Sequence, residues 1–219
     1  MDLRGGLAWV VVLAATGYSA EAQVRLPADE VVLEDTIAVE IIDREVVAFD
    51  LAGSGQLSER LQLDETVLFT ASRGRVALVL TNQRMLAATP VSSSWQEERY
   101  RLAEIPAEEA LLSQGLALLV TSQRALAFFG SGNWAEKSLR PRETLVDARV
   151  GPGVGVVITD RRALGISSRG GFFETGLRPR EEIESLKTLA NLATIVTSQR
   201  TLLFKGALGI WVERRRPLH

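Results

Sequence analysis

The amino-acid sequence predicts an all-β protein made of five similar units, each with four short strands. Three observations support this prediction: an internal repeat of about 39 residues, a fixed order of apolar and polar segments within each unit, and a short polar turn at the same place in every unit. Repeats of this length are typical of architectures in which each unit is one supersecondary motif.

The repeat is visible as four segments that align without gaps. Each contains a threonine followed three residues later by an arginine, and the threonines are residues 81, 121, 159 and 197. Successive copies are therefore 40, 38 and 38 residues apart. A more diverged copy, residues 37–49, precedes them, with Ile42 at the threonine position and Glu45 at the arginine position. Five such repeats would occupy nearly all of residues 23–219.

Within a unit, the four expected strands differ in polarity. The first is modestly apolar, as in residues 66–70, and the second and third are apolar runs such as 116–120 and 125–129. A continuous apolar run of this length is typical of a strand that is buried on both faces. The fourth segment, such as residues 134–141, is more polar and alternates in character. We therefore expect the second and third strands to lie inside and the fourth to meet solvent.

A polar turn separates the second and third strands in all five units. It begins with a short polar side chain, at Asp43, Asn82, Ser122, Asp160 and Ser198. Such side chains can accept a hydrogen bond from the backbone two residues further on, which favours a turn. The sequence therefore predicts a hairpin at this point of each unit.

Four strands per unit, with the polar strand outermost, are expected for the blades of a β-propeller. An open solenoid would need polar capping repeats, which the sequence does not contain. The chain resembles repeat-type β-propellers over essentially all of residues 23–219, although the WD dipeptide, Kelch diglycine and quinoprotein motifs are absent. We predict a five-bladed β-propeller with blades near 24–63, 64–102, 103–140, 141–178 and 179–219, closed by packing of the first blade on the last.

The first 22 residues have the pattern of a signal peptide. Arg4 precedes an uncharged and largely apolar stretch, residues 5–15, and Ala20-Glu21-Ala22 has the small-x-small form of a cleavage site. An uncleaved anchor helix is the alternative. We expect residues 1–22 to be a signal peptide and the mature protein to reside in the periplasm or outside the cell.

Composition excludes several classes of function. The chain has 25 basic and 27 acidic residues, a net charge of −2, so no global positive field exists to attract nucleic acid. It has no cysteine, and its one histidine is the last residue, His219. Thiolate nucleophiles, cysteine-ligated zinc and Ser-His-Asp catalysis are therefore not expected. We predict a protein that is not an enzyme and that needs neither metal nor cofactor.

One set of recurring charged residues could form a site. Four arginines follow the turn between the second and third strands: Arg84, Arg124, Arg162 and Arg200. Four glutamates lie in the links between units, on the same expected face: Glu65, Glu104, Glu143 and Glu181. These residues could form salt bridges between blades, or the guanidinium groups could bind an anionic or polyhydroxylated ligand. Glu45 breaks the symmetry in the first unit.

A second set is aromatic. It occupies the start of the fourth strand and comprises Trp95, Trp134, Phe172 and Trp211. These rings could pack against the next blade or form platforms for sugars. The combination of arginine, glutamate and tryptophan once per blade is similar in residue type to that of fucose-binding propeller lectins, which implies glycan sites between blades.

Acidic residues near the expected channel show no recurrent pair. The first strands supply only scattered carboxylates, Glu34, Asp35, Asp147 and Glu184, whereas glycoside hydrolysis needs a matched pair. The sequence therefore predicts a non-enzymatic binding or scaffold protein that recognises a protein partner through one propeller face. The alternative is a glycan-binding lectin.

Overall fold

The computed structural model describes residues 35–215, apart from residues 52, 54, 168 and 169. All of these residues belong to one compact unit, residues 33–219. The expected signal peptide, residues 1–22, and the expected first strand of the first blade lie outside the described residues. Every regular element among the described residues is a β-strand, and none of these residues forms a helix that could cross a membrane.

The strands form five antiparallel sheets, and in each sheet the strands are neighbours in sequence order. Sheet 1 contains β1 (Ile37–Ile42), β2 (Glu45–Asp50) and β3 (Gln56–Arg60). Sheet 2 contains β4 (Val67–Arg73), β5 (Val76–Thr81), β6 (Arg84–Ala88) and β7 (Gln96–Arg99). Sheet 3 contains β8 (Leu111–Ser113), β9 (Leu116–Val120), β10 (Arg124–Phe129) and β11 (Trp134–Ser138).

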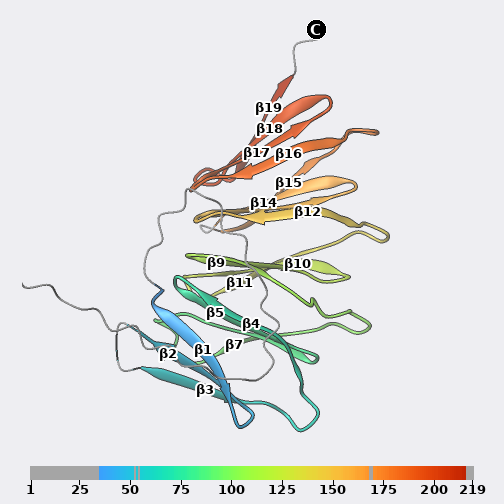
Figure 1. Ribbon diagram of the computed structural model, residues 1–219. Coiled ribbons are helices and arrows are strands. Elements are labelled where there is room, and N and C mark those ends of the chain that lie inside the picture. The colour runs from blue at the N-terminus through green and yellow to red at the C-terminus, as the bar shows by residue number, and fades with distance from the viewer. Residues whose placement is uncertain (1–34, 52, 54, 168–169, 216–219) are drawn as a thin grey trace, which may run out of the picture. The chain divides into compact units, whose positions relative to one another are not determined.

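The last two sheets repeat this plan. Sheet 4 contains β12 (Leu145–Val150), β13 (Val154–Thr159), β14 (Arg162–Ser167) and β15 (Gly171–Gly176). Sheet 5 contains β16 (Ile183–Thr188), β17 (Leu192–Thr197), β18 (Arg200–Lys205) and β19 (Ile210–Arg215). The predicted all-β fold with five propeller blades is confirmed (Figure 1).

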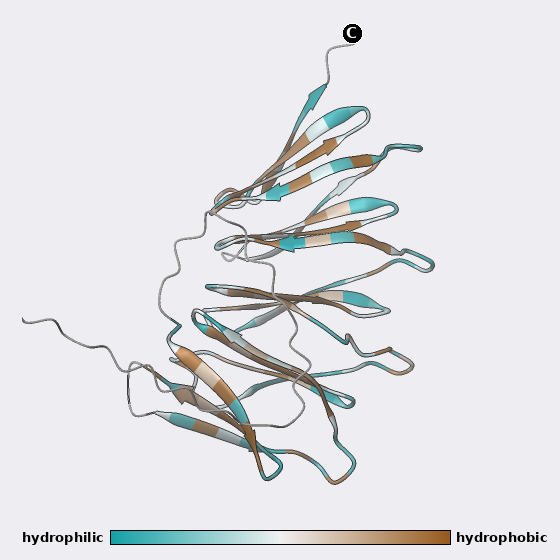
Figure 2. Ribbon diagram, in the orientation of Figure 1, coloured by the Kyte–Doolittle hydropathy of each residue, from teal (hydrophilic) through white to brown (hydrophobic). Residues whose placement is uncertain are grey.

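Burial follows the predicted order of strands. All residues of β5, β6, β10, β13 and β14 are buried, because these strands lie in the middle of a sheet and are covered on both faces. The fourth strands alternate between half-buried and exposed residues, as in β7. Hydrophobic residues accordingly run along the inner strands, whereas hydrophilic residues occur on outer strands such as β3 and β19 and at several turns (Figure 2).

Consecutive sheets pack face to face through four buried clusters. Between sheets 2 and 3, for example, Leu78 and Met85 share a cluster with Leu119 and Phe128. The other three clusters join sheets 1 and 2, 3 and 4, and 4 and 5. Among the described residues no such cluster joins sheet 1 to sheet 5, so the expected closure contact is not found in this part of the chain.

The links between sheets and the turns between the second and third strands lie at the same end of the sheets. The register shows this, because the start of β4 pairs with the end of β5 and the start of β6 pairs with the end of β7. We call this end the link end. It carries the links 61–66, 100–110, 139–144 and 177–182, and the turns that contain Asp43, Asn82, Ser122, Asp160 and Ser198.

The predicted hairpins are present, but in sheets 2 to 5 the expected hydrogen bond within the turn is made by a different residue. Asn82 Oδ1 accepts from the backbone N–H of Thr66, in the link, over 2.9 Å. The bond to the backbone two residues on is instead accepted by the hydroxyl of the preceding Thr81, 3.1 Å from the nitrogen of Gln83. The reason is position: Thr81 faces into the turn, whereas Asn82 lies beside the link. In sheets 2 to 5 the turn is thereby tied to the preceding link.

Packing between sheets 4 and 5 depends on a residue without a side chain. A Cβ atom added to Gly165 of β14 would lie 2.6 Å from the ring of Phe204 on β18. We expect Gly165→Val to lower the free energy of unfolding by about 1–3 kcal/mol, the usual cost of overpacking, as measured by urea denaturation. Gly176→Val, where nothing lies within 4 Å, is the control and should cost much less; equal losses would contradict this account.

Candidate functional site

The four predicted arginines are buried at the link end, where each lies between two sheets. The side chains of Arg84, Arg124, Arg162 and Arg200 have relative exposures of 6, 2, 4 and 7%. Each arginine is the first residue of the third strand of its sheet, directly after the turn. Its side chain therefore extends from one of the two central strands. Each guanidinium group binds the glutamate of the preceding link, which is fully buried.

Arg84 shows the arrangement in full. Its Nε and Nη2 groups donate to the two carboxylate oxygens of Glu65 over 2.8 and 3.1 Å. Nη1 donates to Glu59 of β3 and to Glu97 of β7, each over 2.8 Å. Nη2 also donates to the backbone carbonyl of Arg60, the last residue of sheet 1, over 2.9 Å. All five N–H groups of this guanidinium are thus occupied.

Most of these bonds recur at the next three junctions. The Nε–Oε1 distances are 2.9 Å for Arg124–Glu104 and 2.8 Å for both Arg162–Glu143 and Arg200–Glu181. Each Nη2 group donates to a carbonyl at the end of the preceding sheet, and the acceptors are Arg99, Ser138 and Gly176. Each Nη1 group binds a glutamate on the fourth strand of its own sheet, namely Glu136, Glu174 and Glu213. These arginines therefore join one sheet to the next.

A threonine completes each network. The Thr81 hydroxyl donates to Glu65 over 2.8 Å and accepts from the backbone N–H of Arg84 over 2.9 Å. The second oxygen of Glu65 accepts from the N–H of Gln62 at the start of the link, over 2.8 Å. Link, turn and arginine are thus held in one geometry, and the equivalents Thr121, Thr159 and Thr197 make the same bond to the link glutamate.

The link glutamates are held in their charged form. Burial raises the pKa of Glu143, but hydrogen bonds from Arg162, the Arg140 N–H and Thr159 outweigh it and lower the pKa to about 2. The same balance at Glu181, where Arg200 is the main hydrogen-bond donor, also lowers the pKa to about 2. The networks are therefore buried ion pairs at neutral pH.

The predicted aromatic residues also lie between sheets. Trp95 is 7% exposed within the cluster of sheets 1 and 2, and its Nε1 has no hydrogen-bond partner among the described residues. Trp134 and Trp211 donate from Nε1 to backbone carbonyls of the preceding fourth strand, over 3.3 and 2.9 Å. Phe172 packs, half-buried, against the cluster of sheets 3 and 4. These contacts favour the packing interpretation of the aromatic set.

Sheet 1 departs from the pattern as the sequence predicts. Glu45 at the arginine position and Ile42 at the threonine position are both exposed.

Sequence reasoning missed two other features. The fourth-strand glutamates that bind the arginines recur at positions 97, 136, 174 and 213, a period that could have revealed them. The second feature is a cleft.

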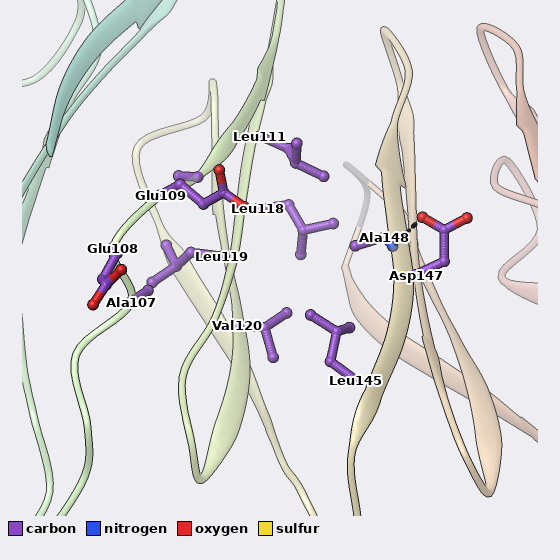
Figure 3. Close-up of a pocket in the computed structure, with 11 residues that line it drawn as sticks. Ala107, Glu108, Glu109, Leu111, Leu118, Leu119, Val120, Leu145, Asp147 and Ala148 are labelled. Carbon is purple, nitrogen blue, oxygen red and sulfur yellow. Dashed lines mark hydrogen bonds between the residues drawn. The ribbon is translucent and has the colours of Figure 1, made fainter. Parts of the chain in front are cut away.

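The cleft lies between sheets 3 and 4 and has a volume of about 260 Å³ (Figure 3). Leu111, Leu118 and Val120 line it from sheet 3, and Leu145 and Ala148 line it from β12. Glu108 and Glu109 are exposed and belong to the segment before β8. The lining contains apolar and acidic side chains but no lysine or arginine.

The cleft exists because the first strand of sheet 3 is short. β8 pairs with β9 at only three positions, from Leu111↔Leu118 to Ser113↔Leu116, whereas β4 pairs with β5 as far as Thr81. Pro106 lies where the strand would begin, and proline cannot donate to a sheet ladder. The traces of this change in the sequence are Pro106 and the unequal step of 40 residues between Thr81 and Thr121.

No protein-family model matches the sequence, and neither does any curated protein. Solved structures that resemble the chain include the WD40 domain of SCAP from fission yeast, with 11% identity and a TM-score of 0.40 over 83% of this chain and 53% of that one. Apo AztD from Citrobacter koseri has 13% identity and a TM-score of 0.40, over 82% and 59%. HIRA (644–1017) has 8% identity and a TM-score of 0.42, over 68% and 52%.

The architecture is that of a repeat-type β-propeller. The chain spans between about half and three fifths of the length of the structures it resembles. No group of three or more metal-ligating side chains occurs in the part of the propeller that the structure describes.

Proposed function

We propose that this propeller is a non-enzymatic binding or scaffold protein of the periplasm or the cell exterior, and that it recognises a protein partner through its link end. The observation that carries the proposal is the exposure of large apolar side chains there. Leu63 is 83% exposed, Leu102 97% and Ile105 67%. A contiguous exposed apolar surface is typical of protein interaction sites, and in this proposal these three side chains contribute to such a surface at the link end.

The links hold these side chains in place before a partner arrives. Leu63 and Leu102 lie two residues before Glu65 and Glu104, whose carboxylates are fixed by an arginine, a threonine and a backbone N–H. A preformed loop loses little conformational freedom on binding, which favours affinity. The ion-pair networks would thus contribute to recognition indirectly, by fixing the links, although their guanidinium groups are buried.

Irregularities in the first strands present further apolar side chains. The register between first and second strands shifts at Leu68 in sheet 2 and at Val146 in sheet 4, and both residues are exposed. A bulge redirects the side chain of the extra residue. These positions follow the links directly, so they belong to the same end of the sheets.

The lectin alternative lacks such support. Sugar stacking needs an open ring face, whereas Trp95 is buried and Trp134 and Trp211 are hydrogen-bonded to the preceding sheet. The location outside the cytoplasm rests on the leader pattern of residues 1–22, and the absence of enzymatic activity rests on composition. Binding of a protein partner is therefore the function that the following experiment tests.

Site-specific photo-crosslinking in living cells tests the proposal. A photoreactive residue at position 105 should give a discrete adduct with a partner, and Leu102→Asp should reduce its yield about tenfold if Leu102 contributes more than 1 kcal/mol to binding. The matched control is Leu208→Asp, because Leu208 is 66% exposed but lies in the turn between β18 and β19, away from the link end. Adducts that respond equally to both substitutions, or no adduct, would refute the proposal.

A further inference from the structure

The cleft between sheets 3 and 4 interrupts an otherwise regular repeat. Its walls are apolar, since Leu118 and Val120 of β9 face Leu145 and Ala148 of β12 across the gap (Figure 3). Leu111 and Leu145 are themselves 37% and 48% exposed, so the cleft is open to solvent. Its volume of about 260 Å³ is below the range of roughly 300–1,000 Å³ typical of cofactor and drug sites, and it suits one or two side chains.

The charge around the cleft is negative, and two of its three carboxylates have no counterion among the described residues. At the four sheet junctions described above, Glu65, Glu104, Glu143 and Glu181 are each bound by an arginine. Glu108 and Glu109, by contrast, form no ion pair among the described residues, and no basic side chain lines the cleft. Asp147 also lines it, but its carboxylate accepts from the backbone N–H of Ala148 over 2.8 Å and lies 4.0 Å from Nε of Arg149. An anionic ligand would be repelled here, whereas a cation would gain charge-assisted contacts.

The cleft also borders a part of β9 that has no neighbouring strand on one side. On the side where β8 would continue, the backbone of Leu119 and Val120 has no strand partner, while the equivalent Leu80 of sheet 2 pairs with Phe69. An unpaired edge can accept an extended peptide, with the side chains setting specificity. Apolar walls, carboxylates without a counterion and an unpaired strand edge thus occur together at sheet 3.

We propose that this cleft binds an extended segment of a partner protein in which an apolar side chain is flanked by lysine or arginine. The apolar side chain enters between Val120 and Leu145, and the basic group pairs with Glu108 or Glu109. The proposal rests on the proposed function, since it names the partner's chemistry at the link end, where Leu145 follows the link 139–144 directly.

The test uses the full chain and two acetylated, amidated pentapeptides, Lys-Leu-Val-Leu-Lys and Glu-Leu-Val-Leu-Glu. Methyl NMR spectra should show shifts of Leu111, Leu118, Val120 and Leu145 on addition of the basic peptide at concentrations up to about 1 mM, the weak end of specific affinity. The acidic peptide should produce none. No shift of these methyl groups, or equal shifts with both peptides, would overturn the proposal.

Substitutions separate the charge from the cavity. Glu108→Gln with Glu109→Gln should weaken binding of the basic peptide at least fivefold, and Ala148→Trp, which fills the cleft, should abolish it. The matched control is Thr70→Trp, at the equivalent and exposed position of β4, which should bind as the unaltered protein does. If Ala148→Trp does not fold, the variant with Glu108→Gln and Glu109→Gln still tests the proposal, because both positions are exposed. Undiminished binding of the basic peptide by that variant would overturn the role of the carboxylates. Peptide binding without a crosslinked partner would contradict the proposed function but not the cleft. A crosslinked partner without peptide binding would contradict the cleft but not the proposed function.

Discussion

Arg124→Ala should lower the free energy of unfolding by about 3–5 kcal/mol, the usual loss when one partner of a buried ion pair is removed. The Arg124 side chain is 2% exposed and its partner Glu104 is fully buried, so the substitution leaves a negative charge with no counterion. It also removes the bond to the Arg99 carbonyl that joins sheets 2 and 3. For a domain of this size the melting temperature should fall by roughly 10 °C or more, which differential scanning calorimetry measures.

Two further variants test the physical cause. Arg99→Ala removes an ion pair with Glu97 in which Arg99 is 76% exposed, and such pairs contribute little, so its melting temperature should stay near that of the unaltered protein. Combining Arg124→Ala with Glu104→Gln should be less harmful than Arg124→Ala alone, because no unpaired charge remains. If the two effects simply add, the buried charge is not the cause.

Stability should fall steeply in acid. The folded pKa of Glu143 and Glu181 is about 2, and hydrogen bonds that outweigh burial also lower the pKa of Glu65 and Glu104. Because glutamate in an unfolded chain has a pKa of about 4.3, the unfolded state takes up protons first as pH falls. The stabilisation is therefore fully present above about pH 4.5 and is lost between about pH 4.5 and 2, by about 2–3 kcal/mol for each of Glu143 and Glu181.

Denaturant titrations at a series of pH values check this expectation. Glu143→Gln should reduce stability at neutral pH, since the charge that binds Arg162 is gone, and should leave a shallower dependence on pH below about 4.5. A slope in acid that matches the unaltered protein would mean that Glu143 is not among the groups that cause the loss.

The sequence by itself determined the repeat, the all-β class and the order of burial within each blade. These follow from local properties: the side-chain period of a strand, the continuous apolar runs such as Leu116–Val120, and the short polar residues at each turn. The recurrence of arginine and glutamate once per blade was equally plain in the sequence. Pattern alone could not decide between a ligand site and an internal contact, because both require the same residues at the same spacing.

Tertiary structure decided what those residues do. Only folding brings Glu65, Thr81 and Arg84 together with the Arg60 carbonyl of the preceding sheet, and that geometry makes the arginines contacts between sheets. The cleft was equally beyond the sequence, since Pro106 shortens β8 but the walls come from β9 and β12, which lie far from it in the chain. Which side chains face an empty space depends on how neighbouring sheets pack, and no single repeat contains that information.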